Sequence, residues 1–265
     1  MSAILHRCAL ITGASSGIGA EFARQLAPDC GRLVLVARRA GRLEKMAAAL
    51  SGDHPGLEVS TFAADLIDSG DRHRLVAWLA KERLIPDLLV NNAGMGDYGE
   101  VATAEWPKLE AMIRLNVESL TWLTHAVMPA MIESGGGAVL NVSSLASLLP
   151  IPDFAVYAAT KAYVTSFSEA LRLEVAEHGI QVTALCPGPV HTEFGDVARR
   201  EDGGGGPLNE AFYVDCAQVV SDGLAGLRRN RARVFPGWKI AGAAVLLSLL
   251  PMVAIRGLMG RRPRR

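Results

Sequence analysis

The sequence predicts a single-domain α/β protein built on a doubly wound parallel sheet, with a helical extension at its C-terminal end. Short apolar or β-branched runs alternate with longer segments of helical periodicity along most of the 265 residues. Runs such as LVLVA (33–37) and LLV (88–90) are apolar throughout, as strands buried on both faces are. This alternation favours right-handed crossovers and a parallel sheet covered by helices on both faces.

Seven segments have the pattern of strands, and most of the segments between them have the pattern of helices. In chain order the predicted strands are 8–13, 32–38, 58–65, 88–94, 138–144, 181–188 and 232–237. The carboxyl ends of parallel strands meet at one edge of the sheet, where ligands bind in folds of this kind. The motifs that follow these strands are therefore the first candidates for a site.

Composition argues against several classes of function. The 27 basic residues balance 27 acidic ones, so the basic excess typical of nucleic-acid-binding proteins is absent and we expect no nucleic-acid partner. Cys8, Cys30, Cys186 and Cys216 follow no metal-ligand spacing, so we interpret them as free thiols in a reducing compartment and expect no metal site. The first residues lack the pattern of a signal peptide, which predicts a cytoplasmic protein.

A glycine-rich turn, TGASSGIG (12–19), follows the first predicted strand and opens a helix. Its glycines allow a tight turn and a close approach of the backbone to a pyrophosphate, and the helix N-terminus directs N–H donors at the anion. The turn therefore predicts a dinucleotide site. Its expected contacts are Gly13, Ser15, Ser16, Gly17, Ile18 and Gly19.

The end of the second predicted strand should approach the ribose of the adenosine. An acidic residue here would accept hydrogen bonds from a 2′-hydroxyl, but the chain has Ala37, Arg38 and Arg39. Guanidinium groups suit a 2′-phosphate, which favours NADP(H) over NAD(H). For Arg39, a solvated position at the start of a helix is an equal alternative.

Tyr157 and Lys161 lie four residues apart in the stretch YAATK. In a helix these two side chains would share a face and could act on one bound molecule. A phenol beside an ammonium group can serve as an acid/base pair.

Further motifs complete a recognisable series. They are NNAG (91–94), Asn116 within RLNVESL, NVSS (141–144) and CPGPVHT (186–192). In this order and spacing, the motifs resemble those of the short-chain dehydrogenase/reductase family from about residue 8 to residue 235. The resemblance implies a Rossmann fold and an enzyme that transfers hydride between NADP(H) and a carbonyl or alcohol.

The resemblance also implies roles for the catalytic residues. Tyr157 would be the acid in carbonyl reduction and the base in alcohol oxidation, and Ser144 would orient the carbonyl. Lys161 would bind the nicotinamide ribose and, with the positive ring of the oxidised cofactor, lower the tyrosine pKa from its usual value of about 10. Asn116 would hold a water that relays protons from Lys161, whereas Ser143, one step along a strand, should point to the other face.

Additional cofactor contacts are implied by the same resemblance. Asp65 would meet the adenine edge, and Leu66 would contribute a backbone contact. Val190 and Thr192 would hold the carboxamide. The remaining implied contacts, which line the cofactor trough or close the sixth strand, are Asn91, Gly94, Pro187 and Gly188.

Apolar side chains surround the expected reaction centre and predict a lipophilic ketone, aldehyde or alcohol as substrate. The candidates for substrate contact are Met95, Leu145, Phe194 and Tyr213, with further apolar or aromatic neighbours at Tyr98, Leu148, Leu149, Ile151 and Phe212. About half of these could equally be core residues. His191 is expected to face solvent rather than to act as a base.

Residues 190–215 are the predicted substrate lid. Their first part, 190–207, contains EDGGGG (201–206), and four consecutive glycines indicate a mobile loop. A disordered surface insertion without a role is the alternative.

The C-terminal segment is apolar and then basic. Sixteen uncharged residues, 240–255, precede RGLMGRRPRR. As a helix they would span about 24 Å, short of the roughly 30 Å hydrocarbon core of a bilayer, and Pro251 would kink them. Contact with an anionic membrane surface at the inner face of a membrane, and packing in a dimer or over the substrate entrance, are both open alternatives, whereas a simple span is disfavoured.

The sequence therefore predicts a catalytic domain over residues 1–237 and an extension over residues 238–265. We expect a reductase that forms a homodimer or homotetramer. The alternative function is a non-catalytic NADP-binding sensor or scaffold that acts through its arginine-rich tail.

Overall fold

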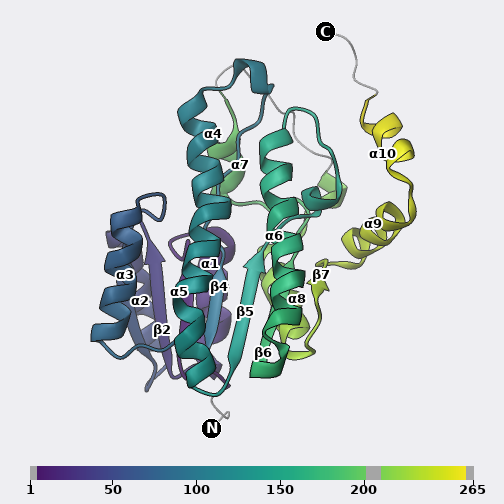
Figure 1. Cartoon of the computed structure of the whole chain (residues 1–265). Helices are drawn as coiled ribbons and strands as arrows, with labels where there is room; N and C mark the ends of the chain where they lie inside the picture. Colours follow the sequence, from purple (N-terminus) through teal and green to yellow (C-terminus); the bar gives the residue numbers. More distant parts are fainter. Residues whose placement is uncertain (1–4, 201–209, 261–265) are drawn as a thin grey trace.

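A single parallel sheet organises the part of the chain that the computed structural model describes, residues 5–200 and 210–260 (Figure 1). Its seven strands lie in the order β3-β2-β1-β4-β5-β6-β7, and every neighbouring pair is parallel. All seven predicted strands are confirmed, and so is the doubly wound fold. The strands are β1 (Ala9–Thr12), β2 (Arg32–Ala37), β3 (Glu58–Ala63), β4 (Leu88–Asn91), β5 (Gly137–Val142), β6 (Ile180–Leu185) and β7 (Arg233–Val234).

Helices cover both faces of the sheet because the strand side chains point alternately to two separate cores. On β2, Leu33 and Leu35 belong to one core, and Val34 and Val36 belong to the other. The first core is closed by α1 (Gly17–Leu26), α2 (Ala40–Asp53) and α8 (Cys216–Arg228). The second is closed by α3 (Ser69–Lys81), α5 (Leu120–Glu133) and α6 (Ala155–Glu174), of which α5 and α6 lie in front of the sheet in Figure 1.

The strand order reverses between β1 and β4. After β1 the chain proceeds outward to β3, and it then returns to place β4 against the other side of β1. The helix after β1 packs on one face of the sheet, and the helices after β4 lead to the opposite face. Because the two connections diverge, the carboxyl ends of β1 and β4 mark the switch point of the topology. In open α/β sheets the ligand-binding crevice lies at this point.

The connection after β4 contains an uncommon helical segment. Helix α4 (Trp106–Ile113) continues through a six-residue π-helical stretch, Arg114–Ser119, directly into α5. π-Helical turns are rare and often occur at functional sites. This one carries Asn116.

The predicted lid contains more regular structure than the sequence indicates. Within the segment 190–207, which was predicted to be a mobile loop, residues Glu193–Ala198 form helix α7. The helix is capped by Thr192, whose Oγ1 accepts a hydrogen bond from the Phe194 N–H at 3.3 Å. The glycine run 201–206 lies outside the described residues, and a short 3₁₀ turn, Glu210–Phe212, follows it.

The C-terminal segment forms two helices, α9 (Trp238–Leu249) and α10 (Met252–Met259). They are separated at Pro251, as predicted, because proline cannot donate the backbone hydrogen bond that would continue a helix. Both lie beside the sheet domain in Figure 1. Within residues 5–200 and 210–260, no helix is both long and apolar enough to cross a membrane.

Candidate active site

Tyr157 and Lys161 lie on the buried face of α6, beside the carboxyl end of β5. Only 7% of Tyr157 and 4% of Lys161 are exposed, and Lys161 Nζ lies 5.7 Å from the centre of the Tyr157 ring. The ammonium group donates a hydrogen bond to the carbonyl oxygen of Val142, the last residue of β5, at 2.8 Å. The two side chains therefore share one face of the helix, as their spacing predicts.

Burial sets the charge states of this pair. It raises the pKa of the Tyr157 phenol well above its usual value, with Ser144 acting in the opposite direction and Tyr98 in the same one. Burial also lowers the pKa of Lys161 to about 8, against the effect of Cys186. The phenol is therefore protonated at neutral pH in the protein alone, and the ammonium group is close to losing its proton. Additional positive charge near the phenol would lower the pKa of Tyr157 towards neutrality.

Ser144 is the serine that stands beside the phenol. It caps the 3₁₀ turn Leu145–Leu148, and its Oγ accepts a hydrogen bond from the Ala146 N–H at 3.1 Å. That contact leaves the hydroxyl proton free to be donated to a ligand. The neighbouring Ser143 hydroxyl is buried and instead contacts α6, at the Lys161 carbonyl oxygen (2.9 Å) and at Thr165 (2.7 Å), so it faces away as predicted.

Asn116 holds the loop after β4 against α6. Its Nδ2 donates to the Met95 carbonyl oxygen at 2.9 Å and to Thr160 Oγ1 at 3.1 Å, while its Oδ1 accepts from the Met95 N–H at 3.0 Å. Gly94 leaves space beside this group, since a Cβ on Gly94 would stand 3.2 Å from Asn116 Oδ1 and 3.5 Å from Lys161 Nζ. Glycine at this position therefore leaves room beside Asn116 Oδ1 and Lys161 Nζ, both of which are buried.

The N-terminus of α1 presents a set of backbone donors at the same edge of the sheet. Its cap residue, Ser16, makes no side-chain capping bond, and the first backbone bond runs from the Ala20 N–H to the Ser16 carbonyl oxygen at 3.2 Å. Within the described part of the chain, the N–H groups of Gly17, Ile18 and Gly19 make no hydrogen bond. Donors of this kind at a helix N-terminus, together with the helix dipole, suit a phosphate group.

Two glycines in this turn have a backbone that a larger residue would strain. Gly13 and Gly17 have φ angles of +66° and +52°. A Cβ on Gly19 would come within 2.3 Å of the Gly13 carbonyl oxygen, so the turn can close only with glycine there. The tight turn predicted for TGASSGIG is therefore present, and its residues fit a dinucleotide pyrophosphate.

The arginines after β2 differ in their surroundings. Arg38 is exposed and makes no side-chain hydrogen bond or ion pair with any described residue, so its donors are available to a ligand. Arg39 instead donates to the hydroxyls of Ser15 (3.0 Å) and Ser16 (2.7 Å) in the glycine turn. It also pairs with Glu193 at 2.7 Å. Arg39 is therefore held at the turn, and Arg38 is the arginine left free.

Glu193 is a residue of this site that the sequence analysis missed. Its carboxylate accepts hydrogen bonds from Arg39 and Arg42, and these bonds lower its pKa to about 2. Because Glu193 begins α7, the ion pairs tie the lid helix to the glycine turn. No signal in the sequence places it there, since it lies 154 residues from Arg39 along the chain.

A second ion cluster holds the other end of the lid helix. Arg200 Nε donates to both carboxylate oxygens of Asp97, at 3.0 and 3.1 Å, and Lys108 Nζ lies 2.9 Å from the same carboxylate. Burial alone would raise the pKa of Asp97, but the hydrogen bonds from Arg200 and Lys108 outweigh this effect and lower it. The lid helix is therefore anchored at both ends by charge.

The segment after β6 forms a wall that joins the two halves of the site. The Pro187 carbonyl oxygen accepts a hydrogen bond from the Leu145 N–H, next to Ser144, at 2.8 Å. At the other end of the segment, the Thr192 methyl carbon would be 3.1 Å from a Cβ on Gly17. Gly188 and Val190, both partly exposed, lie between these contacts.

One predicted cofactor contact needs correction. The side chain of Asn91 does not line the crevice, because its Nδ2 donates to Thr124 Oγ1 and Asn141 Oδ1 inside the protein, both at 2.9 Å. Asn91 is 3% exposed and closes a buried polar network below the sheet edge.

Asp65 and Leu66, two further predicted cofactor contacts, follow β3 at the same edge of the sheet. Asp65 Oδ1 accepts from the Ile67 N–H at 3.1 Å, and the Leu66 carbonyl oxygen accepts from Arg72 at 2.9 Å.

Aromatic rings form a stack around Tyr157. Tyr98 stacks on Phe154 and Phe154 stacks on Tyr157, both with 4.1 Å between ring centres, and Phe194 from the lid lies 5.4 Å from Tyr157. Met95 packs against the same apolar cluster. Phe154 was not among the predicted substrate contacts, although its position three residues before Tyr157, at the N-cap of α6, could have indicated it.

The other two predicted substrate residues lie elsewhere. Leu145 packs with Val190 against the core on the opposite side of the sheet. Tyr213 stacks on His191 with 4.0 Å between ring centres, and His191 is exposed, as predicted. Of the four substrate candidates, Met95 and Phe194 are therefore the two beside the Tyr157 ring.

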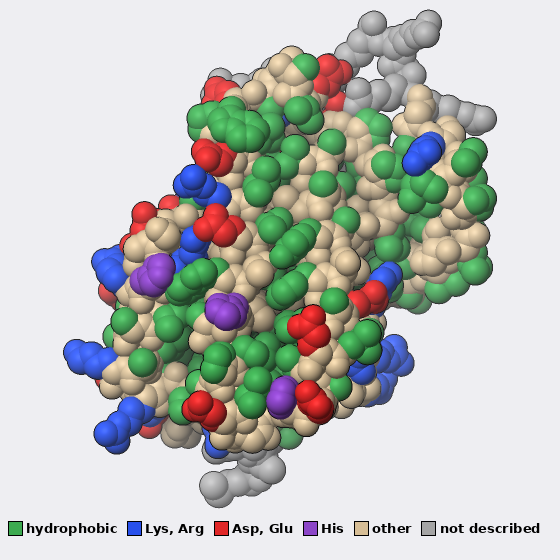
Figure 2. Space-filling view, viewed as in Figure 1, with side chains coloured by type: hydrophobic (Ala, Val, Ile, Leu, Met, Phe, Trp, Pro, Cys, Tyr) green, Lys and Arg blue, Asp and Glu red, His purple; other side chains and the backbone are tan. Residues whose placement is uncertain are grey.

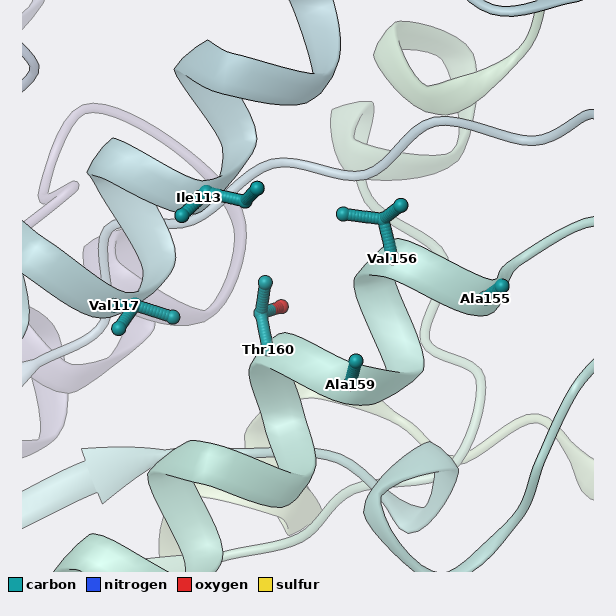
Figure 3. Close-up of a pocket in the computed structure, with 6 residues that line it drawn as sticks. All are labelled: Ile113, Val117, Ala155, Val156, Ala159 and Thr160. Carbon is teal, nitrogen blue, oxygen red and sulfur yellow. The ribbon is translucent and has the colours of Figure 1, made fainter. Parts of the chain in front are cut away.

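An apolar groove lies between the start of α6 and the segment in which α4 passes into the π-helical stretch (Figure 3). It has a volume of about 370 Å³. Neither Tyr157 nor Lys161 lines it. The lining residues are Ile113, Val117, Ala155, Val156, Ala159 and Thr160.

The fold and the site define a class, the Rossmann-fold oxidoreductases. Residues 7–203 match the profile of the short chain dehydrogenases, so the chain belongs to this family. Its relatives include a sulfoacetaldehyde reductase of Chromohalobacter salexigens, which is 36% identical over 82% of this chain and 85% of its own length.

Solved structures of the family are similar along nearly the whole chain. A short-chain dehydrogenase from Sphingobium yanoikuyae, in complex with NADPH, is 34% identical, with a TM-score of 0.81 and 97% of both chains covered. A bulky-bulky ketone specific alcohol dehydrogenase from Comamonas testosteroni is 29% identical, with a TM-score of 0.78, covering 97% of this chain and 95% of that one.

The lowered pKa of Lys161 predicts a pH dependence of stability. The unfolded chain has a lysine pKa of about 10.4, so between about pH 8 and pH 10.4 it binds more protons than the folded protein, and stability rises with pH. Below about pH 8 Lys161 is charged in the folded protein, and its burial lowers the free energy of unfolding by at most about 3 kcal/mol. We expect the free energy of unfolding, measured in urea, to rise by up to this amount between about pH 7.5 and pH 10 relative to Lys161→Met.

Both chains in that comparison should carry Tyr157→Phe, which removes the titration of the phenol. A difference between them that stays constant over this pH range would contradict the assigned charge state of Lys161.

Proposed function

We propose that the protein uses NADP(H) to interconvert a lipophilic ketone or aldehyde and its alcohol, with Tyr157 as the acid/base. The observation that carries this proposal is the burial of Tyr157 and Lys161 together on one face of α6, next to Ser144 and beside Gly94. The NADPH complex of the Sphingobium yanoikuyae relative supports the choice of cofactor.

Different residues at the sheet edge would bind different parts of the cofactor. The uncapped N–H groups of Gly17 to Gly19 would hold the pyrophosphate, and Arg38 would meet the 2′-phosphate. Lys161, beside Gly94, would reach the ribose next to the nicotinamide. When bound, the nicotinamide supplies or accepts the hydride.

Side-chain hydroxyl groups of the protein would donate the hydrogen bonds and the proton that the carbonyl oxygen needs. Negative charge grows on the carbonyl oxygen during reduction, so two donors must converge on it, and Ser144 and Tyr157 are the two hydroxyls available. Because burial keeps the Tyr157 phenol protonated, it can give up its proton as the acid. The ammonium group of Lys161 favours the phenolate that remains. Asn116 keeps one free lone pair on Oδ1, which can hold a water that leads protons towards solvent.

The aromatic stack favours an apolar substrate. Tyr98, Phe154 and Phe194 surround the Tyr157 ring, and Met95 packs with them. Such rings offer large apolar area and few polar partners. The bulky-ketone specificity of the Comamonas testosteroni relative supports this class, whereas the sulfoacetaldehyde reductase is evidence that substrates within the family differ.

We also propose that two or more copies of the chain associate. The apolar groove at the start of α6 and the nearby exposed side chains of Ile113 and Tyr163 support such a contact (Figure 3). Light scattering decides this point, because a mass of 28.1 kDa in solution would be that of a monomer.

The central experiment measures NADPH and NADH oxidation with a panel of lipophilic ketones and aldehydes. We expect turnover with NADPH, and a loss of at least about a hundredfold in Tyr157→Phe, because the variant retains the ring but lacks the proton. Tyr163→Phe, which changes an exposed tyrosine on the same helix, is the matched control and should retain activity. Tight NADPH binding without turnover on any compound would instead favour the sensor or scaffold alternative.

The preference for NADP(H) is tested at Arg38. We expect Arg38→Asp to weaken NADPH binding by roughly tenfold to a hundredfold and NADH binding much less, since only NADPH carries the 2′-phosphate that the guanidinium group would meet. Dissociation constants from fluorescence titration measure both. Equal loss for the two cofactors, or no loss for either, would count against this role. Arg229→Asp, which makes the same change of charge at an exposed arginine that follows α8, is the control.

A further inference from the structure

The outer face of the C-terminal helices is apolar and exposed. On α9, Trp238, Val245 and Leu249 lie at spacings of seven and four residues and therefore on one side of the helix. Trp238 is 81% exposed and Leu249 is 78% exposed, and on α10 Val253 is 76% exposed. Figure 2 shows the apolar side chains that gather on this part of the surface.

The opposite face of α9 is apolar as well, and it is buried. Ile240 and Ala244 are almost fully covered, and Ile240 Cδ1 stands 2.5 Å from the position that a Cβ on Gly188 would occupy. A helix that is apolar on all sides normally has a protein core or a lipid phase around it. Here the protein covers only the face of α9 that contains Ile240 and Ala244, so the exposed face needs another apolar surface or a lipid phase to cover it.

The charge of this segment identifies the medium. Residues 238–265 contain six basic residues and no acidic one, whereas the whole chain has equal numbers of both, so the remaining residues carry an excess of six acidic residues. The basic residues are Lys239, Arg256 and the four arginines of the sequence RRPRR. Apolar side chains combined with concentrated positive charge match the surface of an anionic membrane.

The dimensions of the helices determine how they would contact that surface. Helix α9 has 12 residues and α10 has 8, so they extend about 18 Å and 12 Å, and each is far shorter than the roughly 30 Å hydrocarbon core. Lys239 Nζ lies 5.8 Å from the centre of the Trp238 ring, and this combination of an aromatic ring and an ammonium group is typical of the membrane interface. The two helices therefore suit a position in the plane of the interface.

We propose that α9 and α10 bind an anionic lipid surface through the face formed by Trp238, Val245, Leu249 and Val253. The inner side of α9 packs on Gly188, part of the wall of the active site, so the bound membrane lies about one helix diameter, roughly 10 Å, from that wall. This contact would deliver lipophilic compounds close to the site, but it does not depend on the proposed reaction.

The test is sedimentation of the full chain with phosphatidylcholine vesicles that contain about 30% phosphatidylglycerol, compared with pure phosphatidylcholine vesicles. We expect binding to the anionic vesicles that weakens as sodium chloride is raised. Leu249→Ser should reduce the partition coefficient about tenfold, because one leucine side chain is lost from the apolar face. Leu249→Phe should retain binding.

The matched control is Leu5→Ser, which removes a leucine that is 54% exposed near the N-terminus, at the other end of the molecule in Figure 1. Equal binding of Leu5→Ser and wild type, together with weak binding of Leu249→Ser, supports the proposal. Failure of the wild-type chain to sediment with anionic vesicles overturns it, and so does an equal effect of the two serine variants. A third outcome is possible: the wild-type chain does not sediment with vesicles, light scattering shows that it is a dimer, and Leu249→Ser is a monomer. This outcome would assign the apolar face to contact with a second copy of the chain.

Because vesicle binding is measured without substrate or cofactor, its outcome is separate from that of the proposed reaction. An inactive protein that binds vesicles, or an active protein that does not, would each refute one proposal and leave the other standing.

Discussion

The buried ammonium group of Lys161 is the constraint on which the rest of the site depends. A charge removed from water is costly unless nearby groups compensate for it. Among the described residues, the ammonium group makes one hydrogen bond, to the Val142 carbonyl oxygen, and lies over the Tyr157 ring. The resulting pKa of about 8 keeps the group charged near neutrality but easily deprotonated. The same burial keeps the Tyr157 phenol protonated, so the pair as it stands is an acid, and additional positive charge would be required to make it a base.

The parallel sheet explains why groups from distant parts of the chain surround this pair. Every strand ends at the same edge, so the turn after β1, Gly94 after β4, Ser144 after β5 and the segment after β6 all meet there. Two ion clusters, at Glu193 and at Asp97, then hold α7 and the residues that follow it near this edge. The position of α7 is therefore set by charge, and its side chain Phe194 reaches the Tyr157 ring from there.

Much of this arrangement could be predicted from local sequence patterns. Apolar or β-branched runs indicated all seven strands. The signal is clearest for β1, β2 and β4, which are buried on both faces and therefore consist almost entirely of apolar residues. Helical spacing placed Tyr157 and Lys161 on one face, and the alternation of neighbouring residues separated Ser144 from Ser143. In each case the signal is the period of the local structure, which neighbouring residues determine by themselves.

The features that could not be predicted depend on partners far along the chain. Asn91 was expected in the crevice, but it is directed inwards by Thr124 and Asn141, which join it in a buried network. Glu193 acquires its role only because the fold brings α7 to Arg39, and the same holds for Arg200 and Asp97. Helix α7 itself lies in a segment whose glycine run suggested a loop, and its anchoring ion pairs are long-range contacts.

The pKa of the Tyr157 phenol can be measured by an ultraviolet titration of tyrosinate, taken as the difference between wild type and Tyr157→Phe. We expect a pKa above the usual value of about 10 in the protein alone and a clear decrease towards neutrality when NADP⁺ is bound. A phenol that titrates at or below its usual value in the protein alone, or whose pKa is unchanged by NADP⁺, would show that burial and cofactor charge do not control Tyr157.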